Sequence, residues 1–136
     1  MFLKSQVSVE YMVVMGFAAL MTIPLLIIYY AYSSDATDSV AASQALLIAR
    51  KIVDSSESAY YLGKPSQTTL KLTFPDRIQS INLSNKEVSF KIKTKQGIAE
   101  IVQVANVNMS GSLPTSQGLH IITIAAQDGY VQITSN

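Results

Sequence analysis

Apolar residues dominate one early stretch of the chain. No charged side chain occurs between residues 11 and 32, and most positions there are aliphatic, Met or aromatic. As an α-helix this stretch would extend about 33 Å, because each residue adds about 1.5 Å. That length matches the roughly 30 Å hydrocarbon core of a lipid bilayer. The pattern therefore predicts a membrane-spanning helix.

The chain becomes more polar beyond Tyr32 but keeps a helical period. Apolar residues recur at spacings of four, three, four and then seven, at Ala42, Leu46, Ala49, Val53 and Tyr60. This pattern predicts an amphipathic helix over residues 38–62, either continuous with the first helix or broken at residues 33–37. Gly63 and Pro65 are expected to end it. Its apolar face is expected to cover the sheet that follows.

From residue 68 onward the hydrophobic period changes to two. Leu70, Leu72 and Phe74 alternate with polar side chains, which predicts a half-buried strand over residues 69–74. Similar patterns predict five further antiparallel strands, at residues 78–83, 88–93, 98–107, 119–125 and 130–134. A Ser, Gly and Pro-containing loop is expected at residues 108–118.

The two periods together predict an α+β fold class. A long N-terminal hydrophobic helix is expected over residues 6–62, with its apolar first part suited to a membrane. A small antiparallel β domain is expected over residues 65–136. Residues 1–5 would precede both parts as a short leader. At 136 residues the chain is long enough for one such domain and a long helix.

Glu10 interrupts the apolar character at the start of the first helix. An ionised carboxylate beside an apolar segment is costly unless it meets a positive partner. The one basic residue before it, Lys4, is six positions away and on a different helical face. Glu10 is therefore expected either to lie among lipid headgroups or to find its partner on another chain.

A short motif precedes the apolar run. Basic Lys4 and small Ser5 are followed by Gln6-Val7-Ser8-Val9-Glu10-Tyr11, and no small-residue cleavage site closes the apolar run. These residues resemble the class III signal peptide of archaeal type IV pilin-like proteins. That family's pattern is a basic residue, a small residue and then Q-x-S-x-E-Y before an apolar helix. The resemblance is close over residues 4–32 and looser as far as residue 66.

The resemblance implies that a prepilin peptidase cuts between Ser5 and Gln6, which makes Gln6 the new N-terminus. It also implies that Glu10 meets the terminal amine of a neighbouring subunit and so sets the register of assembly. The recognition motif would consist of Lys4, Gln6, Ser8, Glu10 and Tyr11. The chain departs from the family at one point, because many members carry Gly where this chain has Ser5.

Physical chemistry supports the same pairing independently. A free α-amino group is mostly protonated at neutral pH, so cleavage before Gln6 would place a cation beside an apolar helix that carries an unpaired carboxylate. Between staggered parallel chains the pair would be desolvated and would fix axial register. The alternative is a single-pass anchor with Glu10 at the headgroups, since charges at helix ends are tolerated there.

Pro24 lies within the apolar run. Proline lacks a backbone donor and crowds the preceding helical turn, so we expect a helix kink or a short unwound stretch at this position. A membrane helix tolerates such a residue. Pro24 is therefore expected to mark a point of flexibility in the packed helix.

Residues suited to catalysis are few. The single histidine, His120, lies in an expected apolar strand, the carboxylates are scattered, and the glycines form no phosphate-binding loop. No calcium-loop pattern and no cysteine occur. A net charge of +1 provides no basic field for nucleic acid. We expect no enzymatic activity, no cofactor, no metal and no nucleic-acid partner.

Two sequons, Asn82-Leu83-Ser84 and Asn108-Met109-Ser110, are acceptors for N-glycosylation if the protein is exported. The expected function is a structural subunit of an archaeal type IV pilus-like filament. The partners would be further copies of the chain, the prepilin peptidase, and the cell membrane before assembly, with the mature subunit at the cell surface. The alternatives are a minor pilin or adhesin of the same build, and a membrane-anchored binding domain that does not polymerise.

Overall fold

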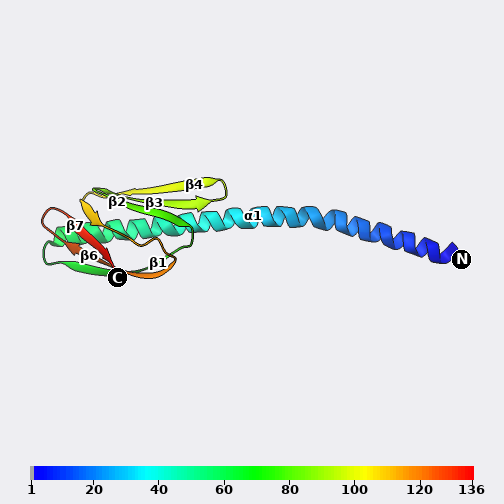
Figure 1. Ribbon diagram of the computed structural model, residues 1–136, viewed down its shortest axis with the longest axis horizontal. Coiled ribbons are helices and arrows are strands. Elements are labelled where there is room, and N and C mark those ends of the chain that lie inside the picture. The colour runs from blue at the N-terminus through cyan, green and yellow to red at the C-terminus, as the bar shows by residue number, and fades with distance from the viewer. Residues whose placement is uncertain (1) are drawn as a thin grey trace. The chain divides into compact units, whose positions relative to one another are not determined.

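The computed structural model describes the backbone of residues 2–136 and the side chains of residues 6–136. This part of the chain forms one helix and seven strands. They are α1 (Phe2–Leu62), β1 (Gln67–Phe74), β2 (Ile78–Ser84), β3 (Glu87–Thr94), β4 (Gly97–Val104), β5 (Met109–Gly111), β6 (Gly118–Ala126) and β7 (Val131–Ser135). A long apolar N-terminal helix followed by a small, mainly antiparallel β domain confirms the predicted α+β class (Figure 1).

The chain divides into two units, Met1–Thr37 and Asp38–Asn136. The first unit is helical from Phe2 onward, and its backbone remains helical through Pro24 and through residues 33–37, where a break was one of two alternatives. Hydroxyl groups donate to carbonyl oxygens of the preceding turn, from Thr22 Oγ1 to Ala18 at 2.7 Å and from Thr37 Oγ1 to Ser33 at 2.9 Å. These bonds occupy polar side chains locally without ending the helix. The kink at Pro24 stays a prediction.

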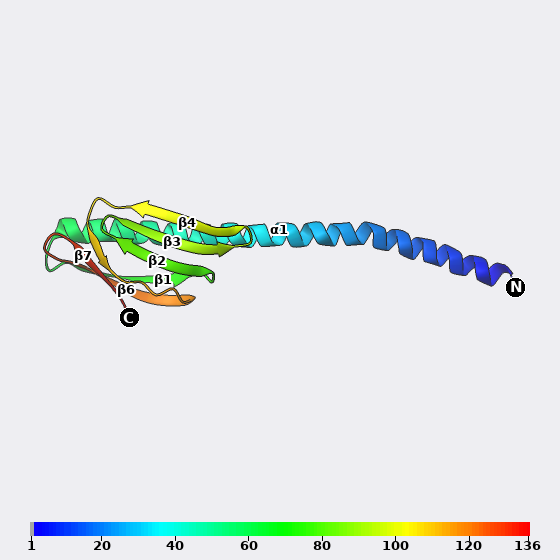
Figure 2. The ribbon, with the colours of Figure 1, turned by 45° about the horizontal axis from the view of Figure 1, so that its top comes forward.

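The second unit combines helical residues 38–62 with two sheets (Figure 2). Four strands form one sheet in the order β1-β6-β7-β5, and three form the other in the order β2-β3-β4. All pairings are antiparallel except that of β5 with β7, which is parallel. The three-stranded sheet is built from consecutive strands, whereas the four-stranded sheet joins the first strand of the domain to its last ones.

One apolar core joins helical residues 38–62 to both sheets. Small side chains on the helix, such as Ala45 and Ala49, are fully buried beside the larger Ile52, so that strands approach the helix closely. From the sheets, Phe74 and Phe90 meet edge to face with ring centroids 6.3 Å apart. The helix face predicted from the apolar spacing packs here in part, because Leu46 of that pattern is only half-buried and does not belong to the core. Ala49 and Val53 are buried, and Ala42 and Tyr60 are partly buried against the core.

The structure differs from the expected strands in the region of residues 98–111. The fourth strand ends at Val104 rather than at residue 107, although the Ala105 N–H still donates to the Lys86 carbonyl at 2.6 Å in the register of the β3–β4 pair. The expected loop at residues 108–118 contains the short strand β5, so six expected strands become seven. A strand of three residues has too few positions to show a period of two, which is why the pattern did not predict it.

Ser56 is the one described buried side chain whose polar atom has no hydrogen-bond partner. An unpaired buried hydroxyl costs about 1–3 kcal/mol by mutational data, and alanine has the higher helix propensity. We expect Ser56→Ala to stabilise the domain by about 1 kcal/mol. Urea unfolding of the full chain in detergent measures this, with Ser58→Ala, whose hydroxyl donates to the Asp54 carbonyl, as the matched control on the same helix. A loss of stability in Ser56→Ala would contradict the prediction.

Candidate functional site

The most prominent surface of the chain is the apolar helix of the first unit. Every side chain in residues 6–33 is exposed, including large ones such as Met12, Leu20 and Tyr32. Within the described residues, α1 is the one helix long and apolar enough to cross a membrane. Water solvates such a surface poorly, so it favours a lipid or protein environment. The structure thus fits a transmembrane helix and membrane anchoring.

Glu10 lies on the exposed surface of this helix, together with Gln6, Ser8 and Tyr11 of the recognition motif. Among the side chains of residues 6–136, Glu10 has no ion-pair or hydrogen-bond partner. Gln6 and Glu10 are four positions apart and so lie on one helical face. The other predicted motif residues, Lys4 and Ser5, have side chains outside the described part. The expected cleavage point and the intersubunit pair stay predictions.

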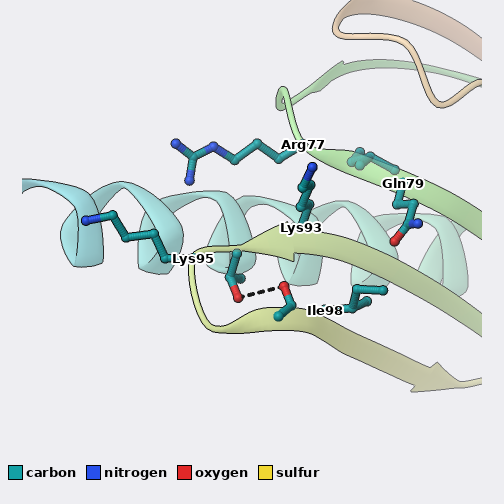
Figure 3. Close-up of a pocket in the computed structure, with 8 residues that line it drawn as sticks. Arg77, Gln79, Lys93, Lys95 and Ile98 are labelled. Carbon is teal, nitrogen blue, oxygen red and sulfur yellow. Dashed lines mark hydrogen bonds between the residues drawn. The ribbon is translucent and has the colours of Figure 1, made fainter.

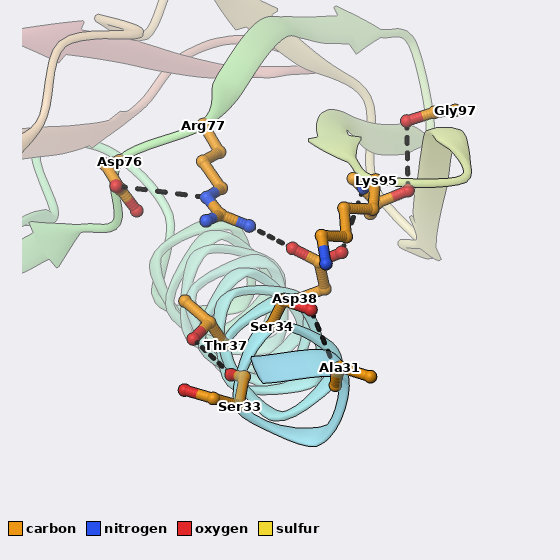
Figure 4. A network of polar contacts seen from close by, with 10 residues as sticks. Ala31, Ser33, Ser34, Thr37, Asp38, Asp76, Arg77, Lys95 and Gly97 are labelled. Carbon is orange, nitrogen blue, oxygen red and sulfur yellow. Dashed lines mark hydrogen bonds and ion pairs between the residues drawn. The ribbon is translucent and has the colours of Figure 1, made fainter. Parts of the chain in front are cut away.

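A second polar feature lies at the start of the second unit, around Asp38 (Figure 4). Its Oδ1 accepts a charge-assisted hydrogen bond from Arg77 Nη1, and its Oδ2 accepts from the Lys95 backbone N–H at 2.9 Å. The Asp38 side chain is only 14% exposed, compared with 34% for Arg77. One carboxylate therefore attaches the helix to two separate strand connections, which lie just before β2 and just after β3.

The backbone of Arg77 is held in an unusual conformation. Its φ is +72°, in the left-handed region that non-glycine residues rarely adopt. The Arg77 carbonyl accepts a hydrogen bond from the Lys93 N–H at 2.9 Å, while its side chain pairs with Asp38. The Nε atom also lies 4.0 Å from Asp76 Oδ2. Contacts at both ends of the residue offset the conformational strain.

Sequence reasoning did not find this network. Asp38 was expected only near the start of a second helix, and Arg77 was not singled out. The two residues are 39 positions apart, and no local pattern pairs an acid on a helix with a base in a distant turn. A lone Arg after Pro75-Asp76 was the one available signal, and it points to a turn rather than to a partner.

A shallow depression of about 460 Å³ lies beside the network, lined by Arg77, Gln79, Lys93, Lys95 and Ile98 among others (Figure 3). Its lining includes no carboxylate, histidine or serine. The Thr94 hydroxyl donates to the Gly97 carbonyl at 3.0 Å. The lining residues therefore supply neither an acid–base pair nor an activated nucleophile.

The His120 ring is held by contacts with Ser116 and Phe74. Its Nε2 lies 2.8 Å from the Ser116 carbonyl oxygen, and because a carbonyl only accepts, this nitrogen carries the proton. The ring packs against Phe74 with centroids 5.2 Å apart. Within the described residues, no group of three His, Asp or Glu side chains is placed to hold a metal ion.

Both sequon asparagines are exposed. Asn82 lies on the edge strand β2, and Asn108 directly precedes β5, where its carbonyl accepts from the Val131 N–H at 2.8 Å. The side chains are thus accessible to a modifying enzyme, and glycosylation at either stays a prediction. In comparisons with models of protein families, with curated proteins and with solved structures, no match to this chain was found.

Proposed function

We propose that this chain is a structural subunit of an archaeal type IV pilus-like surface filament. The observation that carries the proposal is the fully exposed apolar helix of residues 6–33, which has a single carboxylate, Glu10, near its start. The β domain has its own buried core, and among the described residues none before Ala41 contributes to it. The apolar surface of residues 6–33 must therefore be buried by lipid or by another protein chain.

In this proposal the apolar helix is surrounded by two environments in turn. Before assembly, lipid surrounds the apolar helix, and after assembly, neighbouring helices of the same kind replace the lipid. Because lipid and protein interior are similarly apolar, packing and polar pairing decide the transfer rather than hydrophobicity. An unpartnered carboxylate supplies that pairing once a neighbour brings a cation to it.

Cleavage between Ser5 and Gln6 by a prepilin peptidase would provide the cation. The new terminal amine is protonated at neutral pH and lies at the edge of the apolar segment. The motif that supports cleavage is Lys4-Ser5 followed by Gln6, Ser8, Glu10 and Tyr11. In this proposal the motif directs the cleavage, and Glu10 within the motif then pairs with the amine that cleavage creates on a neighbouring subunit.

Mass spectrometry of the native protein tests the proposal. We expect chains in purified surface filaments to begin at Gln6, and chains in membranes to include both the uncut and the cut form. The controls are membranes from cells without the peptidase, where only the uncut form should remain. Uncut chains present as single molecules in the envelope would instead support a membrane-anchored binding domain, and cut chains confined to rare filament ends would support a minor pilin or adhesin.

A further inference from the structure

Four strands lie at sheet edges in the described residues: β1, β5, β2 and β4. An edge strand exposes unpaired backbone groups, and proteins protect such edges with polar or charged side chains or by keeping the strand short. The exposed face of β1 carries Gln67, Thr69, Lys71 and Thr73. β2 exposes Asn82 and Ser84, and β5 has only three residues. The edges at β1 and β2 are thus protected by polar or charged side chains, and the edge at β5 by its short length.

β4 is the exception. Its outward side chains include Ile98, Val102 and Val104, which are 59%, 47% and 66% exposed. Among the described strands it pairs with β3 alone, so its other side carries unpaired backbone groups. The one charge on this face is Glu100, which lies directly across from Lys91 of β3. An apolar edge with free hydrogen-bonding groups is a surface suited to strand addition.

We propose that β4 is an interaction surface for the β4 strand of a second copy, paired antiparallel about Ile101. This register places Ile98 opposite Val104 of the second copy, and Glu100 opposite its Val102. In an antiparallel pair, directly opposite side chains share a face, so all three apolar residues of each copy lie at the new contact. The interface is self-complementary, as a two-fold pairing requires.

β4 is complementary to a second β4 strand in one register, because the neighbouring registers of the same two strands are less favourable. A shift of two residues in one direction sets Glu100 directly against Glu100 of the second copy, and like charges in that position repel. A shift in the other direction moves Ile98 beyond the end of the opposite strand. A shift by one residue would bring outward side chains against inward ones. Only the register centred on Ile101 places all three apolar side chains of each copy in the contact and keeps the two Glu100 carboxylates apart.

A consequence for assembly rests on the proposed function. In Figures 1 and 2, β4 runs along the helical segment of its own unit, residues 38–62. Antiparallel pairing of β4 strands reverses the direction of that segment in the second copy. Subunits within one helical filament all point the same way, so this contact would join two filaments that run in opposite directions.

The test uses the purified full chain in detergent micelles, without filaments. A failure to dimerise would therefore contradict the β4 contact and leave the proposed filament function unaffected. Because the chain has no cysteine, Ile98→Cys/Val104→Cys introduces the only thiols. Mild oxidation should convert most of this variant to a disulfide-linked dimer. The single variant Leu119→Cys is the control, since Leu119 is 64% exposed but lies on β6 of the other sheet, away from the β4 edge.

A second measurement uses light scattering on the same material. Val102→Glu should lower the dimer fraction at least tenfold, because it sets a second carboxylate directly opposite Glu100 at two places in the contact, and like charges in that position repel. Leu119→Glu should leave the dimer fraction unchanged. Monomeric native chain at a concentration on the order of 100 μM, an equal dimer fraction in Val102→Glu, or no crosslink in the cysteine pair would each overturn the proposal.

Discussion

Cells that produce the chain with Glu10→Gln in place of the native chain are expected to display few or no surface filaments. The carboxylate is exposed and without a partner among the described side chains, at the start of a helix that must be covered. In the proposed filament it faces a terminal amine in an apolar environment. Removing one member of a buried ion pair costs about 3–5 kcal/mol, because the other charge stays buried. A cost of that size in each subunit contact would prevent growth.

Electron microscopy and shear-release of surface filaments measure the effect, and immunoblotting of membranes confirms that the variant accumulates. Asp35→Asn is the matched control, because Asp35 is an exposed acid on the same helix but lies beyond the apolar run. The control should assemble normally, and the β domain of Glu10→Gln should keep native protease resistance. Filaments at native levels in Glu10→Gln would show that no such pair is needed.

Gly111→Ala is expected to destabilise the β domain by about 3 kcal/mol. A Cβ atom at this position would lie 1.9 Å from the Ile133 carbonyl oxygen, in the parallel pairing of β5 with β7. The backbone φ of +139° adds strain for any side chain. Overpacking of a tight site costs roughly 1–3 kcal/mol and the conformation about 1 kcal/mol or more in addition. β5 must therefore separate from β7 or distort it.

The measurement is urea unfolding of the full chain in detergent, monitored by the circular dichroism of the β-sheets. Gly97→Ala separates the two causes, because Gly97 has a similar φ of +141° but a Cβ there would meet nothing within 4 Å beyond its chain neighbours. Its loss of stability should be about 1–2 kcal/mol. Equal losses in the two variants would show that the close approach to Ile133 is relieved without cost.

The two hydrophobic periods predicted most of this fold because each is a local property. Residues 69–74 alternate cleanly, and β1 has the expected inward face with Leu72 and Phe74 buried. The apolar run ending at Tyr32 predicted a helix that is exposed along its length in the structure. Elements whose side chains follow one period over two helical turns or about six strand residues are determined by nearby sequence.

The remaining features depend on contacts between distant residues. β5 is defined by its pairing with β7 rather than by any pattern of its own, and the Asp38 to Arg77 pair joins residues 39 positions apart. The apolar outward face of β4 was visible in the sequence as an unusually apolar strand, Ile98 to Val104, but its place at a sheet edge was not. Strand order is what changes that strand from core to surface.

The position of Asp38 has a mechanical consequence for a chain that is pulled. Asp38 is the first residue of the second unit, so tension along the helix that enters this unit acts first at the Asp38 carboxylate. The carboxylate binds the connections beside β2 and β3 at once, through Arg77 and the Lys95 amide. The load would be shared between two connections of the three-stranded sheet rather than borne by one.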